Sequence, residues 1–265
     1  MPNTMAEPRS NILPDERRRL IAGRVNERGA VNSKDLAALF DVSYMTILRD
    51  IKALEQEGRV RAVRGGAIRL KDGLAAEPYF MAKRNLNQEK KQAIAALAAK
   101  SYVSDNDIII LEAGTTVAAM VKHLSQRNIT IMTNGLEVIK EAAASLPTIT
   151  LISSGGILRD VSYTFVGPQA VQFFQEVRAN TLFLSATGLT LPDGITDPNP
   201  LETEVKRAMA ASVERVVLLL DSTKFGVRSL SPVLPLDRIQ VLITNEDMPE
   251  IYRNELHGLM EIVTV

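Results

Sequence analysis

The first seventy residues carry apolar side chains at helical spacing in three short stretches separated by turn residues. The first stretch predicts a helix over residues 14–28, which opens with a proline and is followed by Gly29. Asn32 and Ser43 are residue types that cap helices, and each precedes one of the other two stretches. We therefore expect a second helix after Asn32 and a third from Ser43 to Gly58. The short turn between these two helices is typical of a helix-turn-helix.

The third predicted helix is amphipathic. At about 100° per residue, Ile47, Ile51 and Leu54 share a narrow sector and face a core. The opposite side and the start of such a helix can contact base edges and phosphates in a major groove. Any amphipathic surface helix also has a polar outer face, so this pattern alone leaves both interpretations open. The candidate DNA-binding residues of the two helices are Asn32, Ser33, Ser43, Tyr44, Met45, Thr46, Arg49 and Lys52.

Residues 59–69 alternate basic and apolar side chains on both sides of a Gly-Gly pair, which predicts a two-stranded hairpin. A basic hairpin is by itself typical of a solvated edge strand. Its position directly after a helix-turn-helix favours a DNA-binding wing, and the domain is expected over residues 14–70. The candidate contacts to the phosphate backbone or minor groove are Arg61, Arg64 and Arg69.

The stretch from Arg17 to Ala67 resembles the winged helix of the DeoR family of transcriptional regulators. That family carries a Val-Ser-x-Met-Thr-Ile-Arg-Arg-Asp motif, a Leu-Glu pair and a Gly-Gly-Ala wing. Leu48 stands where the family has arginine, and Arg64 stands where it commonly has histidine, so the DNA sequence that is read is expected to differ from that of typical members. The matching residues are Val42-Ser43-Tyr44-Met45-Thr46-Ile47-Leu48-Arg49-Asp50, Leu54-Glu55 and Gly65-Gly66-Ala67.

The rest of the chain has a different pattern. Residues 71–87 show no clear period and include a glycine and a proline, so we expect a linker there. From Gln88 a helical pattern begins, and short apolar runs then alternate with helix-length segments. This order predicts an α/β main domain over residues 88–265, with a mostly parallel sheet and flanking helices. The predicted strands are 107–111, 129–132, 148–152, 181–184, 216–220 and 240–243.

Ligands of such sheets bind at the carboxyl ends of the strands, and here the residues that follow the strands are mostly polar or glycine. Their N–H groups, hydroxyls and lysines can bind a phosphate. The same residues are also common in turns, and the cations at 206–207 can instead pair with Glu202 and Glu204 on a helix surface. The candidate effector-binding residues are Glu112, Gly114, Thr115, Thr116, Thr133, Asn134, Gly155, Gly156, Lys206 and Lys224.

This half also resembles the DeoR family, in its C-terminal sensor domain, so the resemblance extends from about Asp15 onward. It adds Gly188 and Glu204 to the candidate effector-binding residues. It also implies a fold similar to ribose-5-phosphate isomerase and CoA transferases, with a phosphorylated sugar at the rim of the sheet. Glu112 stands where the family usually has aspartate. The matching residues are Glu89-Lys90, Gly114-Thr115-Thr116, Thr133-Asn134, Gly155-Gly156, Phe165-Val166-Gly167, Gly188, Glu204, Lys206, Asp221 and Lys224-Phe225-Gly226.

Composition narrows the chemistry. With no cysteine and two histidines, disulfide frameworks and zinc sites built on Cys or paired His are excluded, and we expect no metal. No long apolar run or secretion signal is visible, so we expect a cytoplasmic protein without membrane contact. Residues 1–70 hold 13 Lys and Arg and 9 Asp and Glu, a net +4, and the remainder carries −4 because the whole chain is neutral. This asymmetry is consistent with a basic N-terminal domain that binds DNA, followed by an acidic domain that does not.

Together these features predict a repressor of a sugar or carbohydrate operon, with no catalytic residue and no cofactor. Its expected partners are double-stranded operator DNA, a small phosphorylated sugar, and further copies in a homodimer or homotetramer. One alternative is an isomerase-like enzyme whose general base is Glu112, Asp197, Glu204 or Asp221. Another alternative, a scaffold whose N-terminal helices bind protein, leaves the basic wing unexplained.

Overall fold

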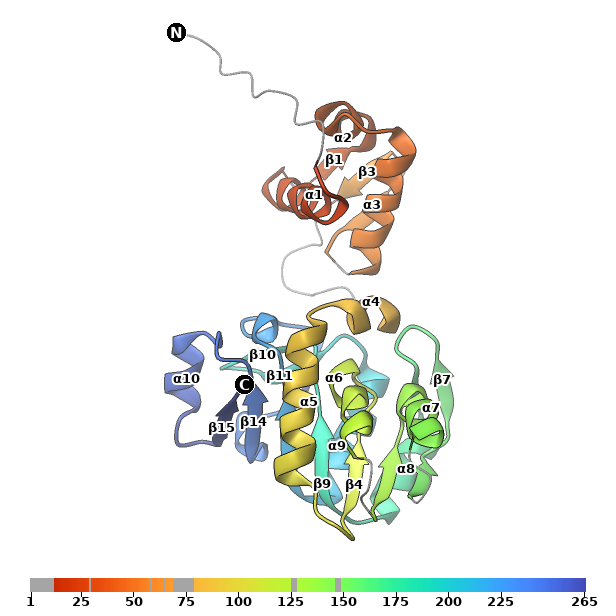
Figure 1. Ribbon diagram of the computed structural model, residues 1–265, viewed down its shortest axis with the longest axis vertical. Helices are drawn as coiled ribbons and strands as arrows, with labels where there is room; N and C mark the ends of the chain where they lie inside the picture. Colours follow the sequence, from red (N-terminus) through yellow and green to blue (C-terminus); the bar gives the residue numbers. More distant parts are fainter. Residues whose placement is uncertain are drawn as a thin grey trace. The chain divides into compact units, whose positions relative to one another are not determined.

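The computed structural model describes residues 12–28, 30–57, 59–63, 65–68, 79–124, 128–145 and 149–265. The chain divides into two compact units, Met1–Ala82 and Lys83–Val265 (Figure 1). This division falls within residues 71–87, where the linker is expected. That range also contains a helix, α4 (Phe80–Asn85), which the sequence analysis did not predict. Six residues are too few to display a helical period.

The first unit is a three-helix winged fold with a small sheet. Its helices are α1 (Pro14–Arg28), α2 (Ser33–Phe40) and α3 (Tyr44–Gln56), and its strands are β1 (Ala30–Asn32), β2 (Arg61–Val63) and β3 (Gly66–Ile68). Both predicted caps are confirmed, because Asn32 Oδ1 accepts from Lys34 N at 2.8 Å and Ser43 Oγ accepts from Thr46 N at 3.1 Å. The hairpin β2–β3 is also confirmed. Strand β1, which was not predicted, pairs with β3.

A buried ion pair joins the first and third helices of this unit. Arg17 Nε of α1 lies 2.6 Å from Asp50 Oδ2 of α3, and both side chains are more than nine-tenths buried. Asp50 is the last residue of the motif that resembles the DeoR winged helix. Its carboxylate lies on the inner side of α3 beside Ile47, Ile51 and Leu54, which are buried as expected. The pair therefore fixes the inner side of α3 and leaves the outer side free.

The second unit is built on a seven-stranded, entirely parallel sheet with the order β15-β14-β12-β9-β4-β5-β6. The mostly parallel α/β fold is thus confirmed, and all six predicted runs are strands of this sheet. The seventh strand, β15, was missed because it is short and only half-buried at the sheet edge. The strands are β4 (Ile108–Leu111), β5 (Thr130–Thr133), β6 (Thr150–Ser153), β9 (Ala179–Leu184), β12 (Val213–Leu219), β14 (Val241–Thr244) and β15 (Glu261–Thr264).

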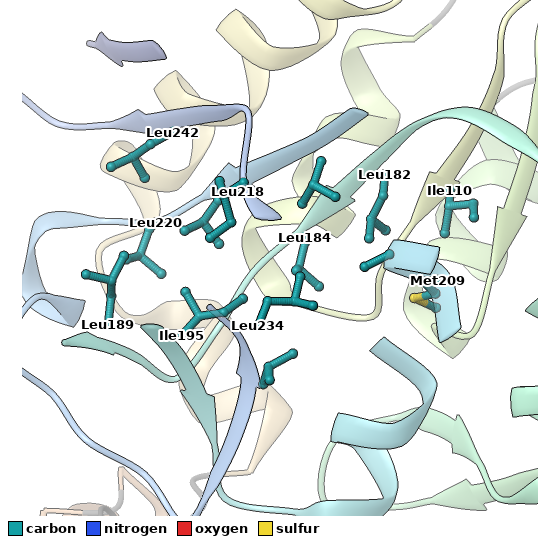
Figure 2. Close-up of a cluster of buried hydrophobic side chains, with 14 of the residues drawn as sticks. Ile110, Leu182, Leu184, Leu189, Ile195, Met209, Leu218, Leu220, Leu234 and Leu242 are labelled. Carbon is teal, nitrogen blue, oxygen red and sulfur yellow. The ribbon is translucent and has the colours of Figure 1, made fainter. Parts of the chain in front are cut away.

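Helices cover both faces of this sheet, and alternate residues of each strand form two separate cores. One core packs the sheet against α5 (Gln88–Tyr102), α6 (Thr115–Ala118) with its 3-10 extension η1 (Ala119–His123), and α7 (Leu136–Ser145). The other packs it against α8 (Pro168–Glu176) and α9 (Pro200–Ala211). Figure 2 shows the second core, in which Leu182 and Leu218 of the sheet lie among the same cluster as Met209 of α9.

Short antiparallel sheets extend the second core. Strands β10 (Gly188–Thr190), β11 (Gly194–Asp197) and β13 (Ser231–Leu234) place Leu189, Ile195 and Leu234 in it (Figure 2). No helix among the described residues is long and apolar enough to cross a membrane. The remaining elements are β7 (Ile157–Arg159), β8 (Thr164–Val166), η2 (Ser222–Lys224), η3 (Leu236–Arg238) and α10 (Glu250–Leu256).

Removing the carboxylate of the Arg17–Asp50 pair is expected to destabilise the winged unit. Asp50→Ala leaves the Arg17 guanidinium buried without its partner, at a cost of about 3–5 kcal/mol. Hydrogen exchange of the full chain measures this directly, because the α3 amides should exchange much faster. Asp35→Ala, at an exposed carboxylate of α2, is the control and should change the opening free energy by less than about 1 kcal/mol. Unchanged α3 exchange in Asp50→Ala would contradict this role.

Candidate DNA-binding and effector sites

The outer side of α3 is accessible as predicted. Met45 is 56% exposed and Tyr44 40% exposed, and Arg49 and Lys52 are also exposed. Ser43 is exposed and Thr46 half-buried, and their hydroxyl oxygens lie 2.8 Å apart. Because one hydroxyl hydrogen is used in that bond, the pair retains one O–H donor for a phosphate oxygen.

The other DNA-binding candidates are placed differently from one another. Asn32 is exposed at the start of α2, whereas Ser33 beside it is fully buried, so its hydroxyl is not accessible to DNA. The expectation that Ser33 contacts DNA is therefore not supported by the structure. Arg61 is exposed on β2. Arg64 and Arg69 lie outside the described residues.

Polar side chains follow almost every strand of the parallel sheet at its carboxyl end. They are buried except for Ser185, which is half-buried. Parallel strands bring these positions to one rim, where a doubly wound α/β sheet binds ligands. Burying so many polar groups carries a free-energy cost unless each is hydrogen-bonded, so their concentration at this rim makes it the candidate ligand site. The residues are Glu112 after β4, Asn134 after β5, Ser154 after β6, Ser185 after β9, Asp221 after β12 and Asn245 after β14.

The centre of this rim is a buried ammonium held by two carboxylates. Lys206 Nζ of α9 lies 2.6 Å from Asp197 Oδ2, 3.1 Å from Glu112 Oε1 and 2.8 Å from the carbonyl oxygen of Ser185. These three acceptors use all three donors of the ammonium. Burial alone would lower the pKa of Lys206, but Asp197 and Glu112 outweigh it and raise that pKa, so the lysine stays charged. Lys206 thus links three segments, the residue after β4, the residue after β9 and the last residue of β11.

Glu112 extends the same network to the phosphate-loop candidate. Its Oε2 accepts from Gly114 N at 2.9 Å and from the Ser185 hydroxyl at 2.9 Å. One N–H that we expected to face a phosphate is therefore already bonded within the protein. The helix that follows is also shorter than expected, since α6 has four residues before it becomes the 3-10 turn η1. Thr115 is half-buried and Thr116 is buried at its start.

On α9 the structure corrects one candidate. Glu204 is exposed and points away from the rim, whereas Glu202 is buried and bonded to Ser162 and Arg159. The helical period explains this difference, because residues 202 and 206 are four apart and share a face, and residue 204 lies opposite. Lys206 is buried and Arg207 donates to the Val233 carbonyl at 3.1 Å, so these two cations are not ordinary helix-surface charges.

The second and third loops contribute one unsatisfied polar atom. Asn134 is fully buried, its Nδ2 donates to the Phe165 carbonyl at 3.3 Å, and its Oδ1 has no partner within the described residues. Thr133 is also buried and its hydroxyl donates to the Leu111 carbonyl at 2.6 Å. A side-chain oxygen without a donor at this rim is suited to accept from a ligand hydroxyl.

The glycine candidates are explained in part by packing. Gly155 and Gly156 follow β6 with positive φ angles of 62° and 109°, which favour glycine. Gly188 is buried in β10, and a Cβ atom there would lie 2.1 Å from the Val227 carbonyl oxygen. A close backbone approach therefore accounts for Gly188 without a ligand.

Lysines gather beside Asp221 on the same rim, including one that the sequence analysis missed. Lys91 of α5 is 6% exposed and donates to the Lys83 carbonyl. Burial lowers its pKa to about 8, Asp221 opposes this shift, and the charges of Lys224 and Lys83 add to it. Burial also lowers the pKa of Lys224. Because Lys83, Lys91 and Lys224 lie close enough to lower one another's pKa despite the opposing charge of Asp221, this part of the rim is suited to an anion.

Among the described residues, no group of three His, Cys, Asp or Glu is placed to hold a metal ion. Four carboxylates were considered as a general base in the sequence analysis. Glu204 is exposed on α9, and the other three are bonded within the protein. Glu112 and Asp197 pair with Lys206, and Asp221 Oδ1 accepts from Thr223 N at 3.1 Å and from Asn87 Nδ2 at 3.2 Å. A winged helix-turn-helix domain joined to a larger α/β domain is the architecture of a class of DNA-binding regulators.

Comparison with known proteins identifies the family within that class. Residues 17–72 match the DeoR-like helix-turn-helix domain, and residues 86–246 match the DeoR C-terminal sensor domain. The chain therefore belongs to the DeoR family of transcriptional regulators. The similar curated proteins are named as transcriptional regulators, so the chain is a regulator and not an enzyme.

Three relatives illustrate the similarity. The HTH-type transcriptional regulator GolR of Listeria innocua is 35% identical, covering 88% of this chain and 91% of that protein. IolR of Bacillus subtilis is 32% identical, covering 84% of this chain and 88% of that protein. The putative aga operon transcriptional repressor of Escherichia coli is 32% identical, covering 98% of this chain and 96% of that protein. Ribose 5-phosphate isomerase A of Methanocaldococcus jannaschii aligns with 18% identity and a TM-score of 0.39, covering 52% and 55% of the two chains, which is too distant to bear on function.

Replacing the central ammonium is expected to destabilise the sensor domain. Lys206→Met leaves two buried carboxylates without their cation, at a cost of about 3–5 kcal/mol of unfolding free energy measured by urea denaturation. The control Lys122→Met removes an exposed cation of η1 and should change that free energy by less than about 0.5 kcal/mol. The triple variant with Glu112→Gln and Asp197→Asn should recover part of the loss. Wild-type stability in Lys206→Met would refute the assignment.

The lowered pKa of Lys91 predicts a pH dependence of stability. Between its folded value of about 8 and the ordinary value of 10.5, the folded state has lost this proton and the unfolded state retains it. Unfolding free energy should therefore rise with pH across this window, by up to about 1.4 kcal/mol per pH unit, relative to Lys91→Met. Lys100→Met, at an exposed position of the same helix, is the control and should track the wild type. A constant difference between wild type and Lys91→Met from pH 7 to 10 would contradict the shift.

Proposed function

We propose that the chain represses a carbohydrate operon by binding operator DNA through its winged helix, and that a phosphorylated sugar bound at the rim of the sensor domain controls this binding. The effector part of this proposal rests on the buried polar side chains at the carboxyl ends of the parallel strands. The family supports DNA binding, and the name of one relative refers to repression of an operon.

On the DNA side, α3 is proposed to lie in the major groove. Its inner face is fixed by Ile47, Ile51 and the Arg17–Asp50 pair, so the exposed side chains of its outer face are available to base edges. Arg49 is proposed to donate two hydrogen bonds to guanine, and Arg61 of β2 to bind a phosphate. Lys52 adds a second cation to the same face of the helix.

On the effector side, the anionic group is proposed to bind the Lys91–Lys224 part of the rim, together with the hydroxyls of Thr115 and Thr116. The sugar hydroxyls would reach the unsatisfied Asn134 Oδ1. Lys206 and Glu112 are proposed to act indirectly, because their hydrogen-bonding groups are used in holding the loops in place.

The start of the sensor domain offers a route from the rim to the linker. Asn87 Nδ2 donates to Asp221 Oδ1 of the rim, and Arg84 pairs with Glu137 and Glu141 of α7. A ligand that shifts Asp221 or Lys91 would therefore shift Asn87 or Lys83, at the end of the expected linker range. We propose that this movement changes the spacing of two winged helices in a homodimer or homotetramer. A regulator of this kind acts where operator DNA is, so its proposed location is the cytoplasm.

The test uses fluorescently labelled DNA from upstream of the gene for this protein, titrated with the full chain at several salt concentrations. Affinity is expected to fall steeply with salt, and Arg61→Ala should reduce the slope of log K against log salt by about 1. Arg178→Ala, at an exposed arginine of the sensor domain, is the control and should leave the slope unchanged. Absence of DNA binding at low salt would refute the proposal.

The same titration with a panel of sugar phosphates tests the effector. One of them is expected to change the affinity for DNA by roughly tenfold, a coupling of about 1.4 kcal/mol. Lys224→Met and Thr116→Val should bind DNA as the wild type does and lose this response. If DNA binding is intact and no sugar phosphate alters it, the effector part of the proposal is wrong.

A further inference from the structure

The outer face of α3 contains an apolar side chain whose exposure packing does not explain. Met45 is 56% exposed, more than Tyr44 beside it, although α3 has a well-formed inner face of Ile47, Ile51 and Leu54. Exposing this much apolar surface gives no stability to the folded domain. A contact with a binding partner is therefore the physical reason to look for.

The surroundings of Met45 indicate the kind of partner. Arg49 and Lys52 lie four and seven residues further along the helix, so all three side chains share one face. Two cations beside one apolar side chain suit a polyanionic surface that carries a small apolar group. In the major groove of DNA the apolar group on a base edge is the 5-methyl group of thymine.

We infer that Met45 reads thymine by contact with its 5-methyl group, an inference that rests on the proposed DNA-binding function. The flexible thioether side chain of methionine adapts well to such a group. Met45 and Arg49 are separated by about 6 Å along the helix axis, and base pairs are about 3.4 Å apart. The thymine is therefore within about two base pairs of the guanine that Arg49 is proposed to bind.

The experiment begins with selection of binding sites from a random double-stranded DNA library by the full chain. Each thymine of the selected site is then replaced, one at a time, by deoxyuridine, which lacks only the methyl group. Loss of one buried methyl contact corresponds to roughly a fourfold loss of affinity, so at least one thymine per half-site should show a threefold to tenfold loss. Met45→Ala should lose affinity for the thymine site by a similar factor and should no longer distinguish thymine from uracil there.

Leu39→Ala is the matched control, because Leu39 is a 47% exposed apolar residue on α2 and not on α3. This variant should keep the full thymine-to-uracil difference. Met45→Ala should also keep the circular dichroism spectrum of the wild type, since its side chain is exposed.

Three results would overturn the inference. The first is that no thymine substitution matters although a site is selected, and the second is that Met45→Ala keeps the same thymine preference. The third is that Met45→Ala changes the assembly state and not DNA affinity, which would assign Met45 to a contact between protein copies. Failure to select any DNA would instead refute the proposed function itself.

Discussion

The buried ammonium of Lys206 is the interaction on which the sensor domain depends. A charge of this kind is tolerated inside a protein when every donor is satisfied, and here two carboxylates and one carbonyl supply the three acceptors. These partners come from segments that are distant in sequence and meet at the carboxyl rim of the sheet. The network therefore holds the loop after β4 together with the end of β9 and strand β11, so the rim has a defined shape before any ligand binds.

A second buried ion pair has the same role in the DNA-binding domain. Arg17 and Asp50 fix α3 against α1 from the inside, and the cap at Ser43 fixes where α3 begins. Because the ion pair is internal, the outer side chains of α3 are free to serve recognition. Exposed residues of α3 such as Tyr44 and Arg49 can therefore be replaced without loss of the fold, and such replacements are expected to change the DNA sequence that is read.

Local patterns predicted most of the fold. Helical spacing identified Ile47, Ile51 and Leu54 as core residues, side-chain chemistry identified the caps Asn32 and Ser43, and apolar runs identified six of the seven parallel strands. Strand β15 and the short antiparallel strands of the sensor domain were missed, because three or four partly polar residues carry no distinctive period.

The site was predicted less completely, because its contacts are non-local. The resemblance indicated Glu204, whereas the helical period from Lys206 would have indicated Glu202, which is the buried residue. Asp197 was considered only as a general base, since its pairing with Lys206 depends on the packing of β11 against α9. Lys91 carried no signal beyond an ordinary helical lysine, and its burial beside Asp221 follows from the position of α5 on the sheet.

The proposed regulation requires that effector and operator bind to one coupled molecule. The most direct measurement is isothermal titration of the sugar phosphate into the free protein and into the protein saturated with operator DNA. Thermodynamic linkage requires that the two affinities differ by the same factor by which the sugar phosphate changes DNA affinity, about tenfold. Equal affinities in the two titrations would contradict the account.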